Sequence, residues 1–365
     1  MAETPDLRVG FLGAGGIAPV HANALQRLPG IELVGVTDIE PSRARRLAEQ
    51  YGAASFGSLE EMLGKAKPDA VHILLPPELH TRFALQCMAA GKHVLVEKPL
   101  CISSSECREL ESAAARFGCI VGVNHNVTFH PAFLELVEVI RQRRLGAVQH
   151  VSVFWNVPFG MVTFGAPLYQ SEGPGAVILE TGSHPLSLIV RLLGEAHSAS
   201  TLVTSQAKGL PDTWLISLGC EHGSAQCFIG IGREFTDTRV HVIGEDGCAV
   251  ADLRLGYVAV TENTRYWPRS FQLKDSTELA ESIVASAGRG FLRRMAEIPK
   301  KGVPHDGALA MQGSVANFYE AIRRNEQPRS SLSQGLAVVR SCLRAIQAGQ
   351  PAAAPREEEL CQRAM

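Results

Sequence analysis

Short apolar runs alternate with stretches of helical periodicity over the first third of the chain. Runs that are apolar at consecutive positions are typical of parallel strands that are buried on both faces. Five such runs occur, at Leu7–Leu12, Ile31–Thr37, Ala70–Leu75, His93–Val96 and Cys119–Val123. With helical segments between them, they predict an α/β fold in which residues 1–124 form a doubly wound Rossmann domain.

The helical segments carry recognisable start and stop signals. Gly52 follows a helical pattern over residues 41–51 and is placed to end it in a left-handed cap. Ser58 with Glu61, and Ser103 with Glu106, have the spacing of a capping box at a helix N-terminus.

Beyond Pro131 the pattern changes to strand-like stretches with few helices between them. The strands are expected at Val148–Val157, Thr201–Ser205, Thr213–Cys220, Ser224–Gly232, Arg239–Ile243 and Cys248–Leu253. The helices are expected at Pro131–Arg144, His305–Arg324 and Ser333–Ala348, and the basic stretch Arg289–Lys301 is interpreted as a solvated helix face. We therefore predict a second α+β domain over residues 125–350 with an open, mainly antiparallel sheet, and a flexible tail over residues 351–365.

One strand of this second domain predicts which way its sheet faces. Trp214, Ile216 and Leu218 alternate with Leu215 and Ser217, so the two faces of the strand differ. The second face is small and only weakly polar. We expect it to pack on another subunit, as a homodimer or homotetramer formed through the sheet.

Composition narrows the class of partner. The 365 residues carry 35 positive and 37 negative side chains, a formal charge of −2, which argues against nucleic acid as a main partner. No apolar run approaches the ~20 residues that span a bilayer, and no secretory signal is visible, so we expect a cytoplasmic protein without a membrane partner. The nine cysteines contain no Cys-x-x-Cys pair and are interpreted as reduced thiols, and no residue spacing predicts a metal site.

A glycine-rich element follows the first predicted strand. Gly13-Ala14-Gly15-Gly16-Ile17-Ala18 matches G-x-G-x-x-A, in which Gly13 permits a tight turn and Gly15 lets the backbone approach a pyrophosphate. The helix N-terminus that begins there, with Gly16 and Ile17, offers N–H groups to the phosphates. Asp38 ends the second strand 20 residues after Ala18, where a carboxylate accepts hydrogen bonds from ribose hydroxyls.

The cofactor follows from this element. The negative charge of Asp38 disfavours a 2′-phosphate, so we expect NAD, with NADP less favoured. Arg43, which lies just beyond Asp38, leaves NADP open because its side chain can reach toward a phosphate.

Three further segments are candidates for the catalytic centre. Glu97-Lys98-Pro99 ends one predicted strand, and Leu75-Pro76-Pro77-Glu78-Leu79-His80 ends the preceding one. Ligands bind at the carboxyl edge of such sheets, which makes Leu75, Pro76, His80, Glu97 and Lys98 candidate contacts. The third segment, Glu180-Thr181-Gly182-Ser183-His184-Pro185-Leu186-Ser187, lies in the second domain.

These residues resemble the Gfo/Idh/MocA oxidoreductase family over about residues 7–345. The resemblance implies a Rossmann domain joined to an open-sheet domain, and the use of NAD or NADP to oxidise or reduce a hydroxyl-bearing carbon of a sugar or cyclic polyol. It also implies that Lys98 is the catalytic lysine. The family's second-domain motif is Asp-x-Gly-x-His-x-x-Asp, so Glu180 and Ser187 replace its two aspartates, and the family's substrate contact at the second of them falls on Ser187.

The chemistry of the residues is consistent with this reading. Hydride transfer from carbon leaves a hydroxyl proton, which His184 can take near neutral pH. The ammonium of Lys98 stabilises developing alkoxide charge, and the carboxylate of Glu180 can fix the tautomer of His184. Pro185 implies that the helix carrying His184 either starts near Gly182 or kinks there.

Other side chains are candidate substrate contacts. Asn124 and His125 end the last Rossmann strand and either reach the cleft or are structural, and His80 either touches the ligands or serves its helix start. The segment from Phe154 to Tyr169 has no charged residue, and Trp155, Phe159 and Phe164 either pack in the core or between subunits, or line a pocket for an apolar group of the substrate. On the second reading, we expect apolar glycosides to be better substrates than free sugars.

Three functions remain open from sequence. The leading one is an NAD(P)-dependent dehydrogenase or reductase that acts on a CH–OH group of a sugar, cyclic polyol or glycoside-like small molecule. A redox-assisted NAD-dependent glycosidase and a non-catalytic dinucleotide sensor are the alternatives, and product analysis and turnover would separate them.

Overall fold

The computed structural model describes residues 7–158, 174–204, 212–262, 269–297 and 306–349. Its first sheet is fully parallel, with the order β3-β2-β1-β4-β5-β6 that defines a Rossmann domain. The strands are β1 (Leu7–Leu12), β2 (Ile31–Thr37), β3 (Ala54–Phe56), β4 (Ala70–Ile73), β5 (His93–Val96) and β6 (Val121–Val123). The predicted α/β class and Rossmann domain are confirmed, although sequence reasoning missed the short edge strand β3.

The helices of this domain begin and end mostly where their capping residues indicated. They are α1 (Ala18–Leu25), α2 (Pro41–Tyr51), α3 (Leu59–Lys65), α4 (Pro77–Ala89) and α5 (Ser104–Phe117). Gly52 ends α2 with φ 74°, and Ser103 with Glu106 forms the full capping box. At α3 only half of the predicted box forms, because the carboxylate of Glu61 accepts the N–H of Gly57 instead of that of Ser58.

The second sheet is open and mixed, with the order β13-β12-β11-β7-β10-β9-β8. Its strands are β7 (Val148–Val157), β8 (Ala196–Thr204), β9 (Thr213–Cys220), β10 (Gly223–Ile231), β11 (Asp237–Gly244), β12 (Gly247–Asp252) and β13 (Tyr257–Glu262). Every neighbouring pair is antiparallel except β7 with β10, which confirms the predicted mainly antiparallel sheet.

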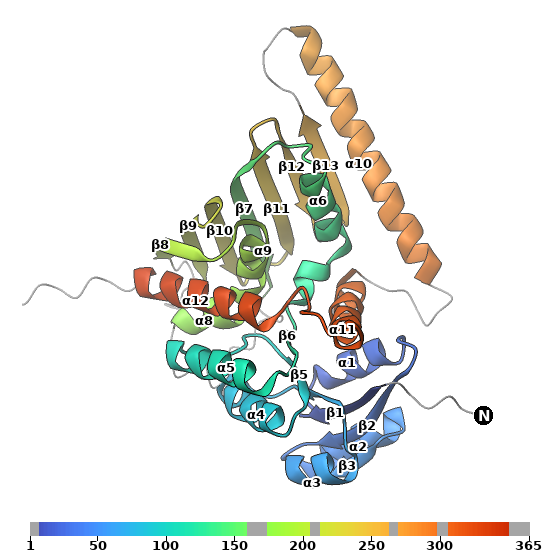
Figure 1. The fold of residues 1–365 in the computed structure, drawn as a ribbon. Coiled ribbons are helices and arrows are strands. Elements are labelled where there is room, and N and C mark those ends of the chain that lie inside the picture. The colour runs from blue at the N-terminus through green and yellow to red at the C-terminus, as the bar shows by residue number, and fades with distance from the viewer. Residues whose placement is uncertain (1–6, 159–173, 205–211, 263–268, 298–305, 350–365) are drawn as a thin grey trace, which may run out of the picture.

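Helices cover one face and one edge of this sheet (Figure 1). They are α6 (Pro131–Arg141), α9 (Ser183–Leu193), α10 (Arg269–Glu297) and α12 (Leu332–Gly349). Three further elements are η1 (Asn126–Phe129), α8 (Pro174–Glu180) and α11 (Asp306–Arg324), and α11 packs against η1 and against α1 of the Rossmann domain. Sequence reasoning missed β13 and most of α10, which runs along β13 at the sheet edge. The predicted basic helix face begins inside α10, where Arg289 pairs with Glu135 of α6, and its residues 298–301 lie outside the described part.

The two faces of the second sheet differ as predicted from β9. Trp214 is fully buried beneath the helices, whereas Leu215 beside it is 46% exposed on the outer face. Phe154 and Leu202 are also exposed on their strands. Within the described residues this outer face therefore has no covering element.

The two domains share one hydrophobic core. A single cluster of buried side chains includes Val96 of β5, Leu336 of α12 and Trp214 of β9. Helix α12 packs against α5 and β6 on one side and against α9 and β8 on the other (Figure 1). This helix thereby brings the carboxyl edge of the Rossmann sheet next to α8 and α9.

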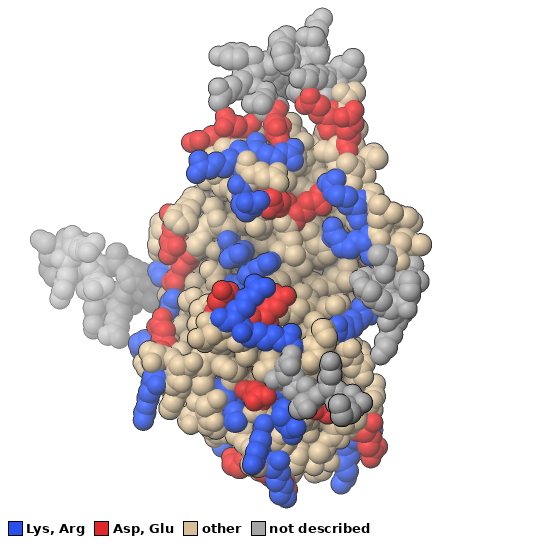
Figure 2. Space-filling model, turned by 45° about the vertical axis from the view of Figure 1, so that its right-hand side comes forward, with Lys and Arg blue, Asp and Glu red and all other residues tan. Residues whose placement is uncertain are grey.

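The surface carries both signs of charge. On the face shown in Figure 2, Lys and Arg side chains are interspersed with Asp and Glu rather than gathered in one patch of a single sign. No helix among the described residues is long and apolar enough to cross a membrane.

Candidate active site

The glycine loop is built to bring backbone close to a ligand. Gly13 has φ +105°, and a Cβ at this position would lie 2.3 Å from the carbonyl oxygen of Leu74 at the end of β4. Gly15 and Gly16 have no atom within 4 Å of the position of a Cβ, so open space lies in front of them. The turn with Gly13 is therefore tight on the sheet side and bare on the other, which fits a pyrophosphate at the start of α1.

Asp38 lies beside this loop at the end of β2. Its carboxylate accepts the N–H of Ala14 at 2.7 Å and that of Glu40 at 2.8 Å. These bonds fix the carboxylate next to the glycine loop, and a carboxylate has further lone pairs for ribose hydroxyls. Arg43 is exposed on the first turn of α2.

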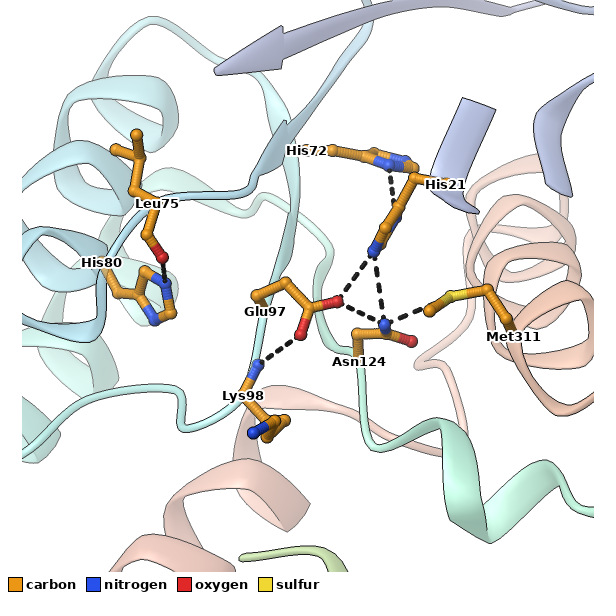
Figure 3. A network of polar contacts seen from close by, with 8 residues as sticks. All are labelled: His21, His72, Leu75, His80, Glu97, Lys98, Asn124 and Met311. Atoms are coloured by element: carbon orange, nitrogen blue, oxygen red, sulfur yellow. Dashed lines mark hydrogen bonds and ion pairs between the residues drawn. The ribbon is translucent and has the colours of Figure 1, made fainter. Parts of the chain in front are cut away.

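Glu97 follows β5 and is the centre of a polar network (Figure 3). Its Oε1 accepts hydrogen bonds from Nε2 of His21 at 2.7 Å and Nδ2 of Asn124 at 2.5 Å, and its Oε2 accepts the N–H of Lys98 at 3.2 Å. Burial by itself raises the pKa of this carboxyl. The hydrogen bonds of His21 and Asn124, with the charge of Lys98, outweigh burial and bring the pKa down to about 2. Glu97 is therefore ionised at neutral pH.

Lys98 connects the two domains. Its Nζ donates a hydrogen bond to the main-chain oxygen of Glu180 at 3.0 Å, and the hydroxyl of Ser183 donates to the same oxygen at 2.9 Å. That oxygen lies at the C-terminus of α8, where carbonyl groups lack helical partners and attract cations. The ammonium is thus held at the junction of the Rossmann sheet and the second domain.

His184 lies one turn further along the same segment. The helix starts again after Gly182, so that Pro185 falls in the first turn of α9 and removes no helical hydrogen bond. The ring of His184 stacks on Trp155 of β7, with centroids 5.6 Å apart and planes at 19°. Burial, and then the charge of Lys98, lower the pKa of His184 well below its usual range. The imidazole is therefore neutral at neutral pH.

Several buried polar atoms around this centre have no partner among the described residues. They are Oδ1 of Asn124, both ring nitrogens of His125 and Nδ1 of His184. Burial and the charge of Lys98 lower the pKa of His125, and the charge of Glu97 raises it. The resulting pKa is about 4, so the ring of His125 is neutral too. Because buried polar atoms are nearly always paired, with protein or with ordered water, this cluster is a candidate site for water or ligand groups.

Comparison with known proteins identifies the family. A model described as "Oxidoreductase family, NAD-binding Rossmann fold" matches residues 7–125, and one described as "GFO/IDH/MocA C-terminal domain" matches residues 133–250. The chain belongs to the Gfo/Idh/MocA family. The predicted resemblance is confirmed, and this Gfo/Idh/MocA protein is an NAD-binding oxidoreductase.

Individual relatives extend the comparison. A 1,5-anhydro-D-fructose reductase of Ensifer adhaerens is 25% identical over 92% of this chain and 96% of its own length. An inositol 2-dehydrogenase of Saccharopolyspora erythraea is 30% identical over 66% of this chain and 72% of its own. Among solved structures, GenD2 from gentamicin A biosynthesis, in complex with NAD, has a TM-score of 0.73 at 24% identity and covers 95% of both chains, which is a likeness of fold.

The structure corrects the role predicted for Glu180. The prediction was that its carboxylate fixes the tautomer of His184, but no hydrogen bond joins these two side chains and Nδ1 of His184 has no described partner. Glu180 instead contributes its main-chain oxygen, to Lys98. Burial raises the pKa of the partly buried Glu180 carboxyl. The charge of Lys98 lowers this pKa and that of Glu78 raises it, and the net change is upward. The motif segment therefore anchors Lys98 through the backbone.

His80 and Ser187 are also committed to protein atoms. The two ring nitrogens of His80 each lie 2.7 Å from a carbonyl oxygen, one of Pro99 and one of Leu75. The ring therefore joins the loop after β5 to the loop after β4, which contains Pro76, and both of its nitrogens face protein atoms rather than a ligand. The hydroxyl of Ser187 donates to the main-chain oxygen of His184 at 2.6 Å, so its hydrogen is not available to a substrate. His80 thus holds two loops of the site together, whereas the bond of Ser187 lies within its own helix.

Three predicted contacts remain to be placed, together with one residue that the sequence did not indicate. Phe159 and Phe164 lie outside the described residues, whereas Trp155 stacks on the ring of His184. Sequence reasoning missed His21, which holds Glu97 from α1. No group of three His, Cys, Asp or Glu side chains in the described part of the chain could hold a metal ion.

Proposed function

We propose that this enzyme oxidises or reduces a secondary CH–OH carbon of a sugar or cyclic polyol, with Lys98 and His184 as its catalytic residues. The observation that carries the proposal is the hydrogen bond by which Lys98 of the Rossmann domain reaches the segment that carries His184. The ammonium of Lys98 is held on the carbonyl of Glu180, four residues before His184. The relatives named above support the substrate class, and they are reductases or dehydrogenases rather than glycosidases or sensors.

Each residue has a defined task. The ammonium of Lys98 faces a substrate oxygen and stabilises the negative charge that develops on it. His184 is neutral, so the ring nitrogen that lacks a hydrogen accepts the hydroxyl proton during oxidation and returns it during reduction. Trp155 keeps that ring in place by stacking on it. Asn124 and His125 offer unpaired polar atoms to further substrate groups.

The cofactor is assigned to the glycine loop and Asp38. The backbone from Gly13 to Ile17 would hold the pyrophosphate, and Asp38 would accept the ribose hydroxyls. NAD, when bound, supplies the hydride acceptor or donor. We propose NAD over NADP because a 2′-phosphate would meet the carboxylate of Asp38.

A screen of substrates tests the proposal. Sugars, polyols and glycosides are offered with NAD and NADP, and with NADH and NADPH for their keto forms, while absorbance is followed at 340 nm. We expect stoichiometric NADH formation with at least one hydroxyl compound. Glycosidic cleavage without net NADH would instead indicate a glycosidase, and tight NADH binding without turnover on any compound would indicate a sensor.

The proposal also covers the role of each domain and the pocket for the substrate. We propose that residues 1–124 bind the cofactor and that residues 125–350 supply the substrate contacts and the subunit interface. The uncharged segment after Trp155, with Phe159 and Phe164, is assigned to an apolar group of the substrate. Equal kcat/KM values for free sugars and their apolar glycosides would refute that assignment.

We also propose a homodimer or homotetramer formed through the second sheet. Its outer face exposes Phe154, Leu202 and Leu215, and exposed apolar area of this kind marks an interface. Light scattering after size exclusion tests this, with Leu215→Glu expected to yield monomers. A monomeric wild type would refute it. The eight described cysteines are free thiols, which supports a reducing compartment, and we propose the cytoplasm.

A further inference from the structure

A line of polar contacts continues from Glu97 into the core of the Rossmann domain (Figure 3). Nδ1 of His21 lies 3.0 Å from Nδ1 of His72 on β4, and Nε2 of His72 lies 2.7 Å from the hydroxyl of Tyr319 on α11. His72 and Tyr319 are 247 residues apart in the sequence. The chain of contacts therefore joins a late helix to the residue that precedes the catalytic lysine.

The members of this chain are sealed from solvent. His21 and His72 have no exposed surface, and Tyr319 is 1% exposed. The ring of His72 stacks between Phe11, at 5.0 Å, and Tyr319, at 5.8 Å. A histidine in the middle of a doubly buried strand is costly unless both of its nitrogens are paired, and here both are.

The protonation of the two outer members follows from burial. Burial lowers the pKa of His72 well below its usual range, so its ring is neutral. Burial, together with the charge of Asp69, raises the pKa of Tyr319 well above its usual range, so it keeps its hydrogen. His72 thus has one N–H and one bare nitrogen, and Tyr319 is a donor.

Two arrangements of the hydrogens satisfy these contacts. In the first, Tyr319 donates to Nε2 of His72, Nδ1–H of His72 donates to Nδ1 of His21, and Nε2–H of His21 donates to Glu97. In the second, His21 is doubly protonated and donates both ways, so that Nε2–H of His72 points at the oxygen of Tyr319. The hydroxyl hydrogen of Tyr319 then has no acceptor, since no described atom other than His72 makes a hydrogen bond with this oxygen. A buried donor without an acceptor is costly, and the first arrangement avoids it.

We propose that Tyr319 and His72 are positioning residues that fix His21 as its Nε2–H tautomer and, through it, hold Glu97 and Lys98 in place for catalysis. Every hydrogen in the chain then points toward the Glu97 carboxylate. Nδ2 of Asn124, which lies 3.3 Å from Nε2 of His21, donates to the same carboxylate oxygen. The proposal rests on the proposed function only for its kinetic readout.

Other titratable groups also face the Glu97 carboxylate. Lys98 acts on it through its charge, and Glu97 in turn raises the pKa values of His80, His125 and His184, which burial lowers. A change in the pH profile is therefore attributed to the hydrogen bonds that link Tyr319, His72, His21 and Glu97 only when it follows a substitution of one of these residues.

Nitrogen NMR of the histidine rings tests the arrangement without any substrate. In wild-type protein labelled with ¹⁵N-histidine, with and without NADH, we expect neutral His72 with its hydrogen on Nδ1 and neutral His21 with its hydrogen on Nε2 at pH 7. Tyr319→Phe should shift the Nε2 signal of His72, because it removes the donor and keeps the ring. A wild-type His72 that carries its hydrogen on Nε2, or a doubly protonated His21, would overturn the proposal.

Kinetics test the consequence for the active site. We expect Tyr319→Phe to lower kcat about threefold to tenfold, the scale of one buried hydrogen bond, with KM for NAD within twofold. Its acidic limb of activity should move to higher pH, because Glu97 becomes easier to protonate. Tyr51→Phe is the matched control, because the hydroxyl of Tyr51 hydrogen-bonds to Asn23 and to the carbonyl of Pro19 and takes no part in the contacts from Tyr319 to Glu97. We expect this variant to leave kcat and the pH profile unchanged.

The outcomes separate this proposal from the proposed function. If Tyr319→Phe lowers the Tm but leaves kcat and the pH profile unchanged, the chain is only structural and the positioning role is wrong. If no compound is turned over by the wild type, the proposed function fails, and the tautomers seen by NMR still decide whether the chain is arranged as described.

Discussion

Replacing Glu97 by glutamine removes the negative charge at the centre of the buried network and nearly keeps its shape. The side chain of Glu97 is only 12% exposed, and its Oε1 accepts from both His21 and Asn124. A glutamine oxygen accepts more weakly than a carboxylate, and its amide group has hydrogens where Glu97 has only lone pairs.

The magnitude follows from the pKa. The pKa of Glu97 is about 2 in the folded protein, against about 4.3 in an unfolded chain. A lowered pKa contributes stability above the unfolded value, and this contribution disappears as pH falls through the folded value. At pH 7 the contribution is about 3 kcal/mol. We therefore expect Glu97→Gln to lower the free energy of unfolding by about that amount at pH 7, with the loss shrinking between about pH 5 and pH 2.

Guanidinium unfolding followed by circular dichroism at several pH values measures this difference. Glu61→Gln is the matched control, since Glu61 pairs with Lys65 on the surface and exposed pairs of this kind contribute little. A Glu97→Gln loss below about 1 kcal/mol at pH 7, or a loss that is equal at all pH values, would refute the assignment of Glu97 as a buried, stabilising anion.

Three further substitutions test the site. Gly13→Ala places a Cβ 2.3 Å from the oxygen of Leu74 at φ +105°, so NADH binding followed by fluorescence should weaken at least about tenfold; unchanged affinity would contradict the loop assignment. Asp38→Ala should reduce the preference for NADH over NADPH in the same titration, and a retained preference would show that another residue sets it. His184→Asn should lower kcat by about 10²–10⁴ at neutral pH with NADH affinity kept; an effect on KM alone would assign His184 to binding.

Local signals in the sequence were sufficient for most of the fold. Continuous apolar runs identified five of the six Rossmann strands, and capping residues such as Gly52 and Ser103 placed helix ends. Strand order could not be predicted from such local signals, because it depends on contacts between distant segments. The parallel pairing of β7 with β10 and the long helix α10 beside β13 have no local signature of that kind.

The same distinction between local signals and distant contacts applies to the site. The positions of Lys98, Asp38 and Gly13 follow from motifs at strand ends, whereas the bond from Lys98 to the carbonyl of Glu180 involves backbone, which no side-chain pattern reveals. A polar His72 within the apolar run at β4 was a usable signal, because a buried histidine needs partners. Its actual partner, Tyr319, is supplied by a helix remote in sequence.

The most direct measurement of the central claim is the turnover of Lys98→Met with the substrate that the 340 nm screen identifies. Methionine keeps an unbranched side chain, one heavy atom shorter than that of lysine, and removes the ammonium that the Glu180 carbonyl holds. We expect kcat to fall by about 10²–10⁴, with the affinity for NADH within about threefold because the glycine loop and Asp38 are untouched. Turnover at the wild-type rate in a variant that binds NADH normally would contradict the assignment of Lys98 as the catalytic residue.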